Sequence, residues 1–239
     1  MRKSLFALAA AATLTAGVAH AAPATYAIDP AHTFVTFEIS HFGASVNRGR
    51  FDKKEGSVQF DRAGKAGKVE ISFDATSVNT GTAAFDKHLQ GPDFFDAAKH
   101  PTIKFTSDKF SFNGDNVSEV TGQLTLLGKT APVTLKANQF TCYQSPMLKR
   151  EVCGGDFETI IDRSVFGMNY GIEWGFPKNG RLLVQVEAVK QETGFPPVKP
   201  PAGYSAGGFF FMQRPCGGPA PRRLTCTHGV GCSTVQNYF

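Results

Sequence analysis

The chain of 239 residues is long enough for one sizeable domain, and 22 of its residues are Phe. Its formal net charge of +5 comes from its two ends. Two of the 25 basic residues precede residue 22 and four follow residue 195, so residues 22–195 hold 19 basic and 20 acidic residues. A nearly neutral body offers no basic patch to displace counterions from a phosphate backbone, which argues against nucleic acid as a partner.

Residues 1–21 have the three parts of a secretory signal peptide. Arg2 and Lys3 supply a basic start, an Ala/Leu-rich stretch follows, and Ala19-His20-Ala21 forms a small-residue cleavage site. The apolar stretch is too short and too rich in small residues for a good membrane span. We therefore expect cleavage after Ala21 and export of the mature chain.

Between residues 26 and 190 apolar and polar residues alternate in runs that are typical of β-strands. The runs are rich in Val, Ile, Thr and Phe, and Gly, Asp or Asn separates many of them. They cover residues 32–40, 56–61, 68–75, 102–112, 117–127, 131–141, 156–162 and 181–190. An open sheet of this size would expose two edges. The pattern therefore predicts an all-β domain over residues 22–195, a closed antiparallel barrel of about eight strands.

The aromatic content of the first half of this domain is high, with twelve Phe between residues 34 and 112. Flat, rigid rings commonly line an apolar ligand cavity. A barrel of eight strands has room for one small ligand. Ordinary core packing explains the same residues, so both interpretations stay open.

One segment, GTAAFDKHLQGPDFFDAAKHP at residues 81–101, interrupts the alternation. Its first part, residues 82–89, predicts one or two helical turns that end at the Gly-Pro pair that follows. Phe85 and Leu89 are four apart and share a face of that helix, and two more Phe residues follow on a second short turn. We expect short helices over one end of the barrel, either as core closure or as a lid over a lipid-sized cavity. A catalytic role is the third interpretation.

The polar residues of the domain match no catalytic or metal-binding pattern. His32 and His41 are nine positions apart, so an unbroken strand would point them to opposite faces. His88 and His100 have no partner at a ligand spacing. The motif DRSVFG lacks the G-x-S-x-G nucleophile elbow of α/β-hydrolases. The Asp residues of the 81–101 segment are typical turn residues. We therefore expect no metal site and no catalytic residues.

The five cysteines fall into two groups. Cys142 and Cys153 flank ten residues between two strand-like runs, and in an oxidising compartment they are predicted to close a hairpin with a disulfide. The other three lie in residues 196–239, a Pro/Gly-rich tail without Asp or Glu. The tail has no sustained periodicity, so we expect it to be disordered.

Several motifs resemble those of the YceI-like polyisoprenoid-binding proteins, in order and with normal spacing from about Tyr26 to Lys190. They are IDPAHTFVTFEISHFGASVNRGRFDKKEGSVQFD, ATSVNTG, FDKHLQGPDFFDAAKHPTIKFTS, GQLTLLGKTAPVTL and DRSVFGM. The resemblance implies a lipocalin-like antiparallel barrel in the bacterial periplasm that holds an isoprenoid chain, and it implies no catalysis. Where many members have Arg-Asp, this chain has Phe85-Asp86, which argues against a charged head group contacted at that position.

The functional hypothesis is a periplasmic binding protein for an isoprenoid lipid of the quinone or prenyl phosphate type, acting as carrier, store or stress-related sequesterer. The alternative is an enzyme that acts on a small apolar or isoprenoid substrate. No cofactor other than the bound lipid is expected. A transient contact with a membrane or a membrane protein is compatible with this role, and the oligomeric state is left open.

The residues expected to form the cavity and its lid are Phe34, Phe37, Phe42, Phe51, Phe73, Phe85, Leu89, Phe94, Phe95, Phe105 and Phe166. Those expected at the mouth, near a head group, are His41, Arg50, Asp86, His88 and Arg163.

Overall fold

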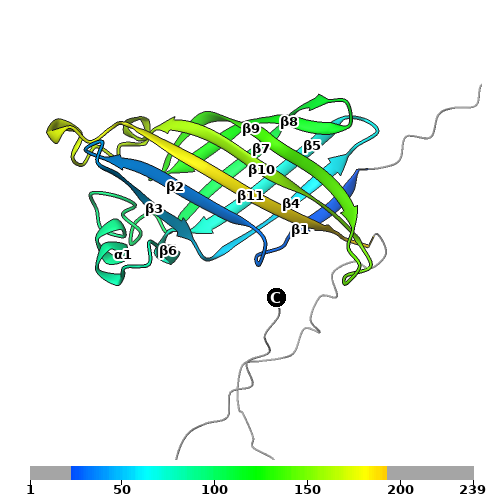
Figure 1. Cartoon of the computed structure of the whole chain (residues 1–239), viewed down its shortest axis with the longest axis horizontal. Coiled ribbons are helices and arrows are strands. Elements are labelled where there is room, and N and C mark those ends of the chain that lie inside the picture. The colour runs from blue at the N-terminus through cyan, green and yellow to red at the C-terminus, as the bar shows by residue number, and fades with distance from the viewer. Residues whose placement is uncertain (1–22, 193–239) are drawn as a thin grey trace, which may run out of the picture. The chain divides into compact units, whose positions relative to one another are not determined.

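The structure is a computed structural model that describes residues 23–192 (Figure 1). The predicted signal peptide, residues 1–21, and the predicted tail, residues 196–239, lie outside the described residues. Among residues 23–192, no helix combines the length and the apolar character needed to cross a membrane.

Eight antiparallel strands form a closed ring. β1 pairs with β4 on one side and with β11 on the other, which closes the sheet and removes both edges. The ring consists of β1 (Ala24–Ile28), β4 (Lys54–Asp61), β5 (Ala66–Asp74), β7 (Thr102–Asn113), β8 (Asn116–Leu126), β9 (Lys129–Gln144), β10 (Glu151–Asp162) and β11 (Asn179–Lys190). The predicted closed, lipocalin-like all-β barrel is confirmed.

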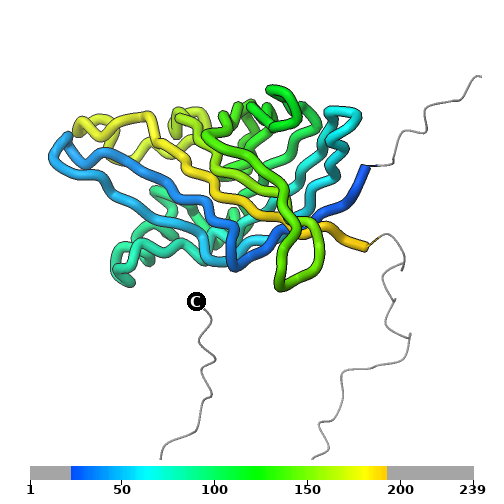
Figure 2. Tube along the Cα trace, turned by 45° about the vertical axis from the view of Figure 1, so that its right-hand side comes forward, coloured from blue at the N-terminus to red at the C-terminus, as the bar shows by residue number. Residues whose placement is uncertain are grey.

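Three further strands lengthen one side of the barrel wall. They are β2 (Phe34–His41), β3 (Ser45–Phe51) and β6 (Val78–Asn79). β1 pairs with the last residues of β11 and β2 pairs with Arg181–Gln185 of the same strand, so β1 and β2 follow one another along one edge of β11. The β2–β3 hairpin therefore extends past the ring, as Figures 1 and 2 show.

At the end of the barrel reached by this hairpin, β9 and β10 separate. Their ladder stops at the pair Lys136 and Glu158, although both strands continue toward this end. There the first residues of β9 pair only with β8, and the last residues of β10 pair only with β11. The β5–β7 ladder, in contrast, runs to Asp74 and Thr102, where both strands end. No ladder within residues 23–192 joins β9 to β10 beyond Glu158, so side chains and connecting segments must fill the space between them.

Short helical segments occupy this same end (Figure 1). The helix α1 (Ala83–Leu89) is the only α-helix among the described residues, and the predicted turns at 82–89 are thus confirmed. Three 3₁₀ turns accompany it, η1 (Ala75–Ser77), η2 (Arg163–Phe166) and η3 (Ile172–Trp174). Asp86 accepts hydrogen bonds from the backbone amide and the hydroxyl of Thr80, at 2.6 and 2.7 Å, and so ties α1 to the chain that enters it.

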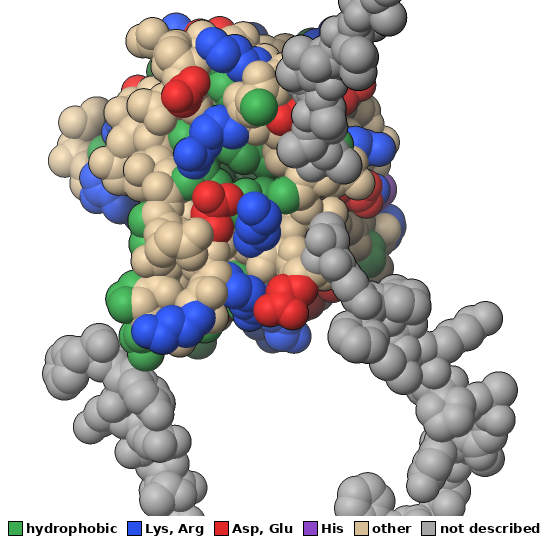
Figure 3. Space-filling view, turned by 90° about the vertical axis from the view of Figure 1, so that its right-hand side faces the viewer, with side chains coloured by type: hydrophobic (Ala, Val, Ile, Leu, Met, Phe, Trp, Pro, Cys, Tyr) green, Lys and Arg blue, Asp and Glu red, His purple; other side chains and the backbone are tan. Residues whose placement is uncertain are grey.

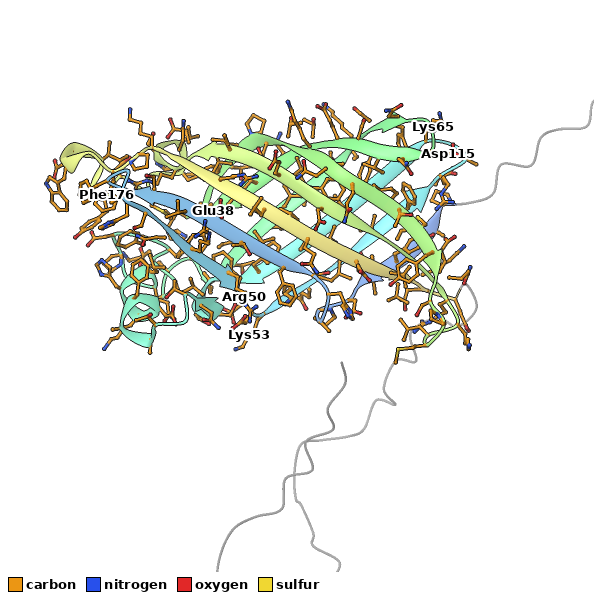
Figure 4. The ribbon with its side chains drawn as sticks, viewed as in Figure 1. Glu38, Arg50, Lys53, Lys65, Asp115 and Phe176 are labelled. Carbon is orange, nitrogen blue, oxygen red and sulfur yellow. A yellow bond between two sulfur atoms is a disulfide. The ribbon has the colours of Figure 1, made fainter. Side chains whose placement is uncertain are left out.

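The two ends of the barrel differ in the side chains that they carry. The aromatic end comprises the β2–β3 turn, residues 80–101 and the β10–β11 connection, residues 163–178. The charged end comprises the β4–β5 turn, the β7–β8 turn and the tip of the β9–β10 hairpin. Figure 4 labels Phe176 at the first end and Lys65 and Asp115 at the second.

The disulfide between Cys142 and Cys153 joins β9 to β10 near the charged end. The two residues are direct partners in the β9–β10 ladder, so the bond links neighbouring strands at the same height. The tip beyond it is held by a backbone hydrogen bond from Ser145 N to Arg150 O, 2.9 Å long. The predicted pairing of these two cysteines is present in the structure.

Candidate ligand cavity

Two adjoining chambers lie inside the barrel. The inner chamber has a volume of about 120 Å³, and the outer chamber, toward the aromatic end, has a volume of about 340 Å³. They share four lining residues, Val35, Phe73, Leu124 and Leu182, and together we call them the lumen. The outer chamber alone is within the usual size range of small-molecule sites, roughly 300–1,000 Å³.

Glycines in neighbouring strands explain how an interior rich in Phe leaves a lumen. A Cβ added to Gly49 would lie 2.3 Å from Cζ of Phe37, its ladder partner, because the Phe37 ring lies flat over the glycine. The Phe105 ring covers Gly122 in the same way, with Cζ at 2.6 Å from an added Cβ. Rings placed against the wall line the lumen instead of filling it.

The inner chamber is almost entirely apolar and ends in polar groups at the charged end. Tyr26 is 3% exposed and its hydroxyl donates a hydrogen bond to Glu151, whose carboxylate also lies 3.6 Å from Lys190 Nζ. Burial, together with this hydrogen bond, raises the pKa of the Tyr26 phenol. Figure 3 looks onto this end and shows apolar side chains in a central recess surrounded by Lys, Arg, Asp and Glu.

The outer chamber carries the polar side chains of the lumen. His41, Asn47, His88 and Tyr170 line it among apolar residues. His88 and Tyr170 are also exposed to solvent, so the chamber reaches the surface between α1 and the β10–β11 connection. The mouth of the lumen is therefore at the aromatic end.

Arg163 also lines the outer chamber, but its side chain has a structural role. Arg163 is 4% exposed, and its guanidinium donates to the carbonyl oxygens of Pro177, Met168 and Tyr170 at 3.0, 3.0 and 2.9 Å. Burial lowers the pKa of Arg163 from its ordinary value. Every guanidinium nitrogen thus holds the β10–β11 connection in place. Arg163 is therefore a positioning residue for the mouth.

Residues 80–101 cover the outer chamber from one side. Leu89 and Phe95 are buried, and the Phe95 ring packs on Phe37 and Phe51 with centroids 5.8 and 5.2 Å apart. Phe94 is only half-buried and contacts His88 and Tyr170 at 4.8 and 5.0 Å. In this segment Phe95 therefore packs on the core, whereas Phe94 borders the mouth, where a lid is expected.

Most of the residues expected in the cavity lie on its wall. The lining includes Phe37, Phe51, Phe73, Phe85, Leu89, Phe94, Phe95 and Phe105. Of the residues expected at the mouth, His41 and His88 line the outer chamber, and neither imidazole makes a hydrogen bond to another described residue.

The other five expectations are corrected by the structure. Phe34 points outward, and Lys54 and Arg50 lie over its ring at 4.1 and 5.0 Å, so neither Phe34 nor Arg50 belongs to the lumen. Arg50 pairs instead with Asp52 at 2.8 Å on the outer wall.

Phe42 is 57% exposed at the tip of the β2–β3 hairpin, outside the chamber. Phe166 is 2% exposed and packs in the core without lining either chamber. Asp86 does not line the lumen, because its carboxylate is occupied by Thr80.

The β10–β11 connection supplies cavity residues that the sequence analysis missed. Met168, Tyr170 and Phe176 all line the outer chamber. The available signal was the stretch GMNYGIEWGFP, in which aromatic residues alternate with glycines. Asn47 was missed because β3 has a polar sequence that does not look like a strand. No group of three or more His, Cys, Asp or Glu side chains within residues 23–192 is arranged to hold a metal ion.

A closed antiparallel barrel with an apolar lumen is the architecture of the lipocalin-like class of proteins. Within this class, residues 26–188 match the family model of the YceI-like domain. The chain belongs to the YceI-like family.

Individual relatives agree with this assignment. The chain is 42% identical over 139 residues to a UPF0312 protein of Pseudomonas aeruginosa, covering 57% of this chain and 72% of the relative. Among solved structures, it is similar to BcnA of Burkholderia cenocepacia, with a TM-score of 0.56 and 25% identity over 67% of this chain and 98% of BcnA. A polyisoprenoid-binding domain from Saccharophagus degradans, implicated in plant cell wall breakdown, shares the fold with a TM-score of 0.52 at 16% identity, covering 71% and 99% of the two chains.

Proposed function

We propose that this protein is exported to the periplasm, where it holds an isoprenoid lipid in the lumen of the barrel as a carrier, store or sequesterer. The observation that carries the proposal is the largely apolar lumen formed by the two adjoining chambers. The family assignment and the polyisoprenoid-binding domain of the same fold support the choice of lipid. The bound lipid is the only small molecule that the proposal requires.

The tail of the lipid would occupy the inner chamber. Burying hydrocarbon contributes about 0.8 kcal/mol per CH₂, so a prenyl chain gains affinity in proportion to its buried length. Rings that lie flat on the wall, such as Phe37 over Gly49, suit a linear and branched chain because they leave the axis of the barrel free.

The head group would lie in the outer chamber, where the polar side chains are. Among the described residues that line it, Arg163 is the only Lys or Arg, and backbone carbonyls occupy its guanidinium. His41, Asn47 and His88 offer hydrogen bonds to a neutral polar group. Of the two head groups considered, a quinone-type ring therefore suits this chamber better than a phosphate.

A matched pair of substitutions in β11 tests the lumen. Leu182 lines both chambers, while its neighbour Leu183 lies on the outer surface beside Phe34 and Gln185. Leu182→Trp should block the lumen and abolish the lipid seen by native mass spectrometry of protein taken from its own periplasm. Leu183→Trp should retain the lipid. Equal lipid content in both variants would refute binding in the lumen.

The same preparations test the enzymatic alternative. The lipid should be recovered from the wild-type protein with unchanged mass after prolonged incubation, and His88→Ala should alter its retention only modestly. If wild-type protein consumed a defined prenyl substrate and His88→Ala did not, the binding role would be wrong and an enzyme would be indicated.

A further inference from the structure

The aromatic end exposes large rings on two different loops. Phe42 and Trp174 are each 57% exposed and Tyr170 is 37% exposed. The Phe42 ring packs on Phe176 with centroids 4.5 Å apart, so the β2–β3 turn and the β10–β11 connection meet through these rings. Figures 1 and 2 both show these two loops projecting side by side from the same end. We call Phe42, Tyr170, Trp174 and Phe176 the aromatic rim.

The rim is continuous with the lumen. Trp174 contacts Tyr170 at 5.2 Å, and Tyr170 contacts Phe94 at 5.0 Å. Tyr170 and Phe94 line the outer chamber, whereas Trp174 does not. A path of neighbouring rings therefore leads from a mostly exposed Trp to the cavity wall.

The backbone at Phe42 gives an independent reason to assign the rim a role outside the fold. Phe42 and Gly43 both have positive φ, 54° and 75°, and Ala44 N donates to His41 O at 3.0 Å across the turn. Turns with two central residues at positive φ favour Asn, Asp or Gly at the first of them. A bulky residue there is strained by roughly 1–2 kcal/mol, and such outliers cluster at functional sites. The ring of Phe42 is mostly in water, so burial does not repay that strain.

We propose that the aromatic rim docks on the surface of a phospholipid bilayer, with Phe42 and Trp174 in the interfacial region. The proposal rests on the proposed function, because docking there would align the mouth of the lumen with the membrane in which a prenyl lipid resides. Trp and Tyr favour the membrane–water interface, where the ring is in apolar surroundings and its polar atom stays hydrated. The excess of one acidic residue over residues 22–195 gives no net attraction to an anionic bilayer, so the proposed attraction is apolar and the bilayer need not be anionic.

Trp174 makes the experiment direct, because it is the only tryptophan of the chain. Mature, delipidated protein is mixed with phosphatidylcholine vesicles, and the emission of Trp174 is recorded. We expect a blue shift, quenching by brominated phosphatidylcholine, and the same affinity at low and high salt. The signal reports this end of the barrel and not residues 193–239.

Phe42→Asn is the test variant, and it keeps the tryptophan. Asn tolerates positive φ, so the variant should fold at least as stably as wild type, yet its affinity for vesicles should fall by about tenfold. Met147→Asn is the matched control, since Met147 is 79% exposed at the charged end. It should bind vesicles like wild type. Absence of a blue shift in wild type, or equal loss in both variants, would overturn the docking proposal.

Two further outcomes would also overturn it. Binding that requires phosphatidylglycerol and disappears in salt would mean that charge drives the contact. Phe42-dependent binding to native membranes but not to pure lipid vesicles would mean that the partner is a membrane protein.

Lipid loading is scored separately with a fluorescent prenyl probe delivered without vesicles. Phe42→Asn should take up this probe like wild type and extract it more slowly from vesicles. Failure of wild type to bind the probe would reject the proposed function while vesicle binding is still measured. Normal uptake without vesicle binding would reject the docking proposal alone.

Discussion

The aromatic end and the charged end of this barrel are connected by the same strands but closed by different means. At the charged end, the ladders stay paired, a disulfide ties β9 to β10, and Tyr26, Glu151 and Lys190 form a polar cluster beyond the inner chamber. At the aromatic end, the β9–β10 ladder stops before its strands do, and rings from three connecting segments fill the space. The charged end is closed by a covalent bond and paired strands, whereas the aromatic end is closed by side chains and connecting segments.

The largest change in unfolding free energy is expected at the aromatic end, where one Phe is packed in the core and another borders the mouth. Phe166→Ala should cost about 4 kcal/mol of unfolding free energy, because its ring is 2% exposed and truncation leaves a cavity. Phe94→Ala should cost about 1 kcal/mol, since the half-buried Phe94 ring already borders the open chamber. Denaturant unfolding of delipidated protein measures both, because bound lipid would raise the apparent stability.

The rate of probe release provides the complementary measurement for the same pair. Phe94→Ala should release a fluorescent prenyl probe faster than wild type. Equal destabilisation by the two variants with unaltered release would show that Phe94 is plain core and that the ligand enters elsewhere.

Arg163→Met tests whether this residue positions the mouth. Removing the guanidinium leaves the carbonyls of Pro177, Met168 and Tyr170 without their donor, and we expect a loss of about 3 kcal/mol. Thermal unfolding measures the loss, and Arg163→Lys should recover only part of it because one ammonium cannot reach three carbonyls in the same geometry. Unchanged stability with lost lipid binding would instead make Arg163 a head-group ligand.

At the charged end, replacing Cys142 and Cys153 together by Ser should cost about 2–3 kcal/mol, the value expected for a loop of this length. Probe affinity should stay within about twofold of wild type, since one sulfur-bearing residue, Cys153, is a minor part of the inner wall. Peptide mapping without reduction should find these two cysteines joined in exported protein. A bond from Cys142 to a cysteine beyond residue 195 would contradict both the structure and the expectation of an independent tail.

The smallest effect concerns the phenol of Tyr26. Tyr26→Phe should lose about 1 kcal/mol at neutral pH, because one hydrogen bond to a carboxylate disappears. The pKa of this phenol is raised in the folded state, so its contribution is complete below about pH 10, its ordinary pKa, and is lost as the pH rises further. The stability difference between wild type and variant should therefore shrink above about pH 10. A difference that grows with pH would mean that the phenol is ionised in the folded protein.

The alternating sequence was sufficient to predict the barrel, and stricter use of the same rule would have improved the site. Phe34 and Phe37 are three residues apart, so on one unbroken strand they cannot both face inward. The structure places Phe37 inside with Val35 and Phe34 outside. The fold class can be predicted from the alternation of apolar and polar residues alone. The assignment of a residue to the cavity also requires knowing which of the alternating positions face inward.

Other parts of the site have no local signature. β3 reads SVNRGRF, and its inward positions are Asn47 at the polar mouth, Gly49 beneath the Phe37 ring and Phe51. The glycine of β3 is explained only by the aromatic ring of the neighbouring strand, and its asparagine only by the polar mouth. The position of the β10–β11 connection depends on the bonds of Arg163 to three carbonyls, which no periodicity encodes.

The early end of the β9–β10 ladder has a mechanical consequence for the size of the ligand. Beyond Glu158 no ladder pair joins these two described strands, so they can move apart at the aromatic end without breaking a ladder hydrogen bond between them. Widening the entrance then costs dispersion contacts of about 0.1–0.2 kcal/mol per atom pair. The resting diameter of the entrance is therefore not an upper limit on the thickness of the molecule that passes through it.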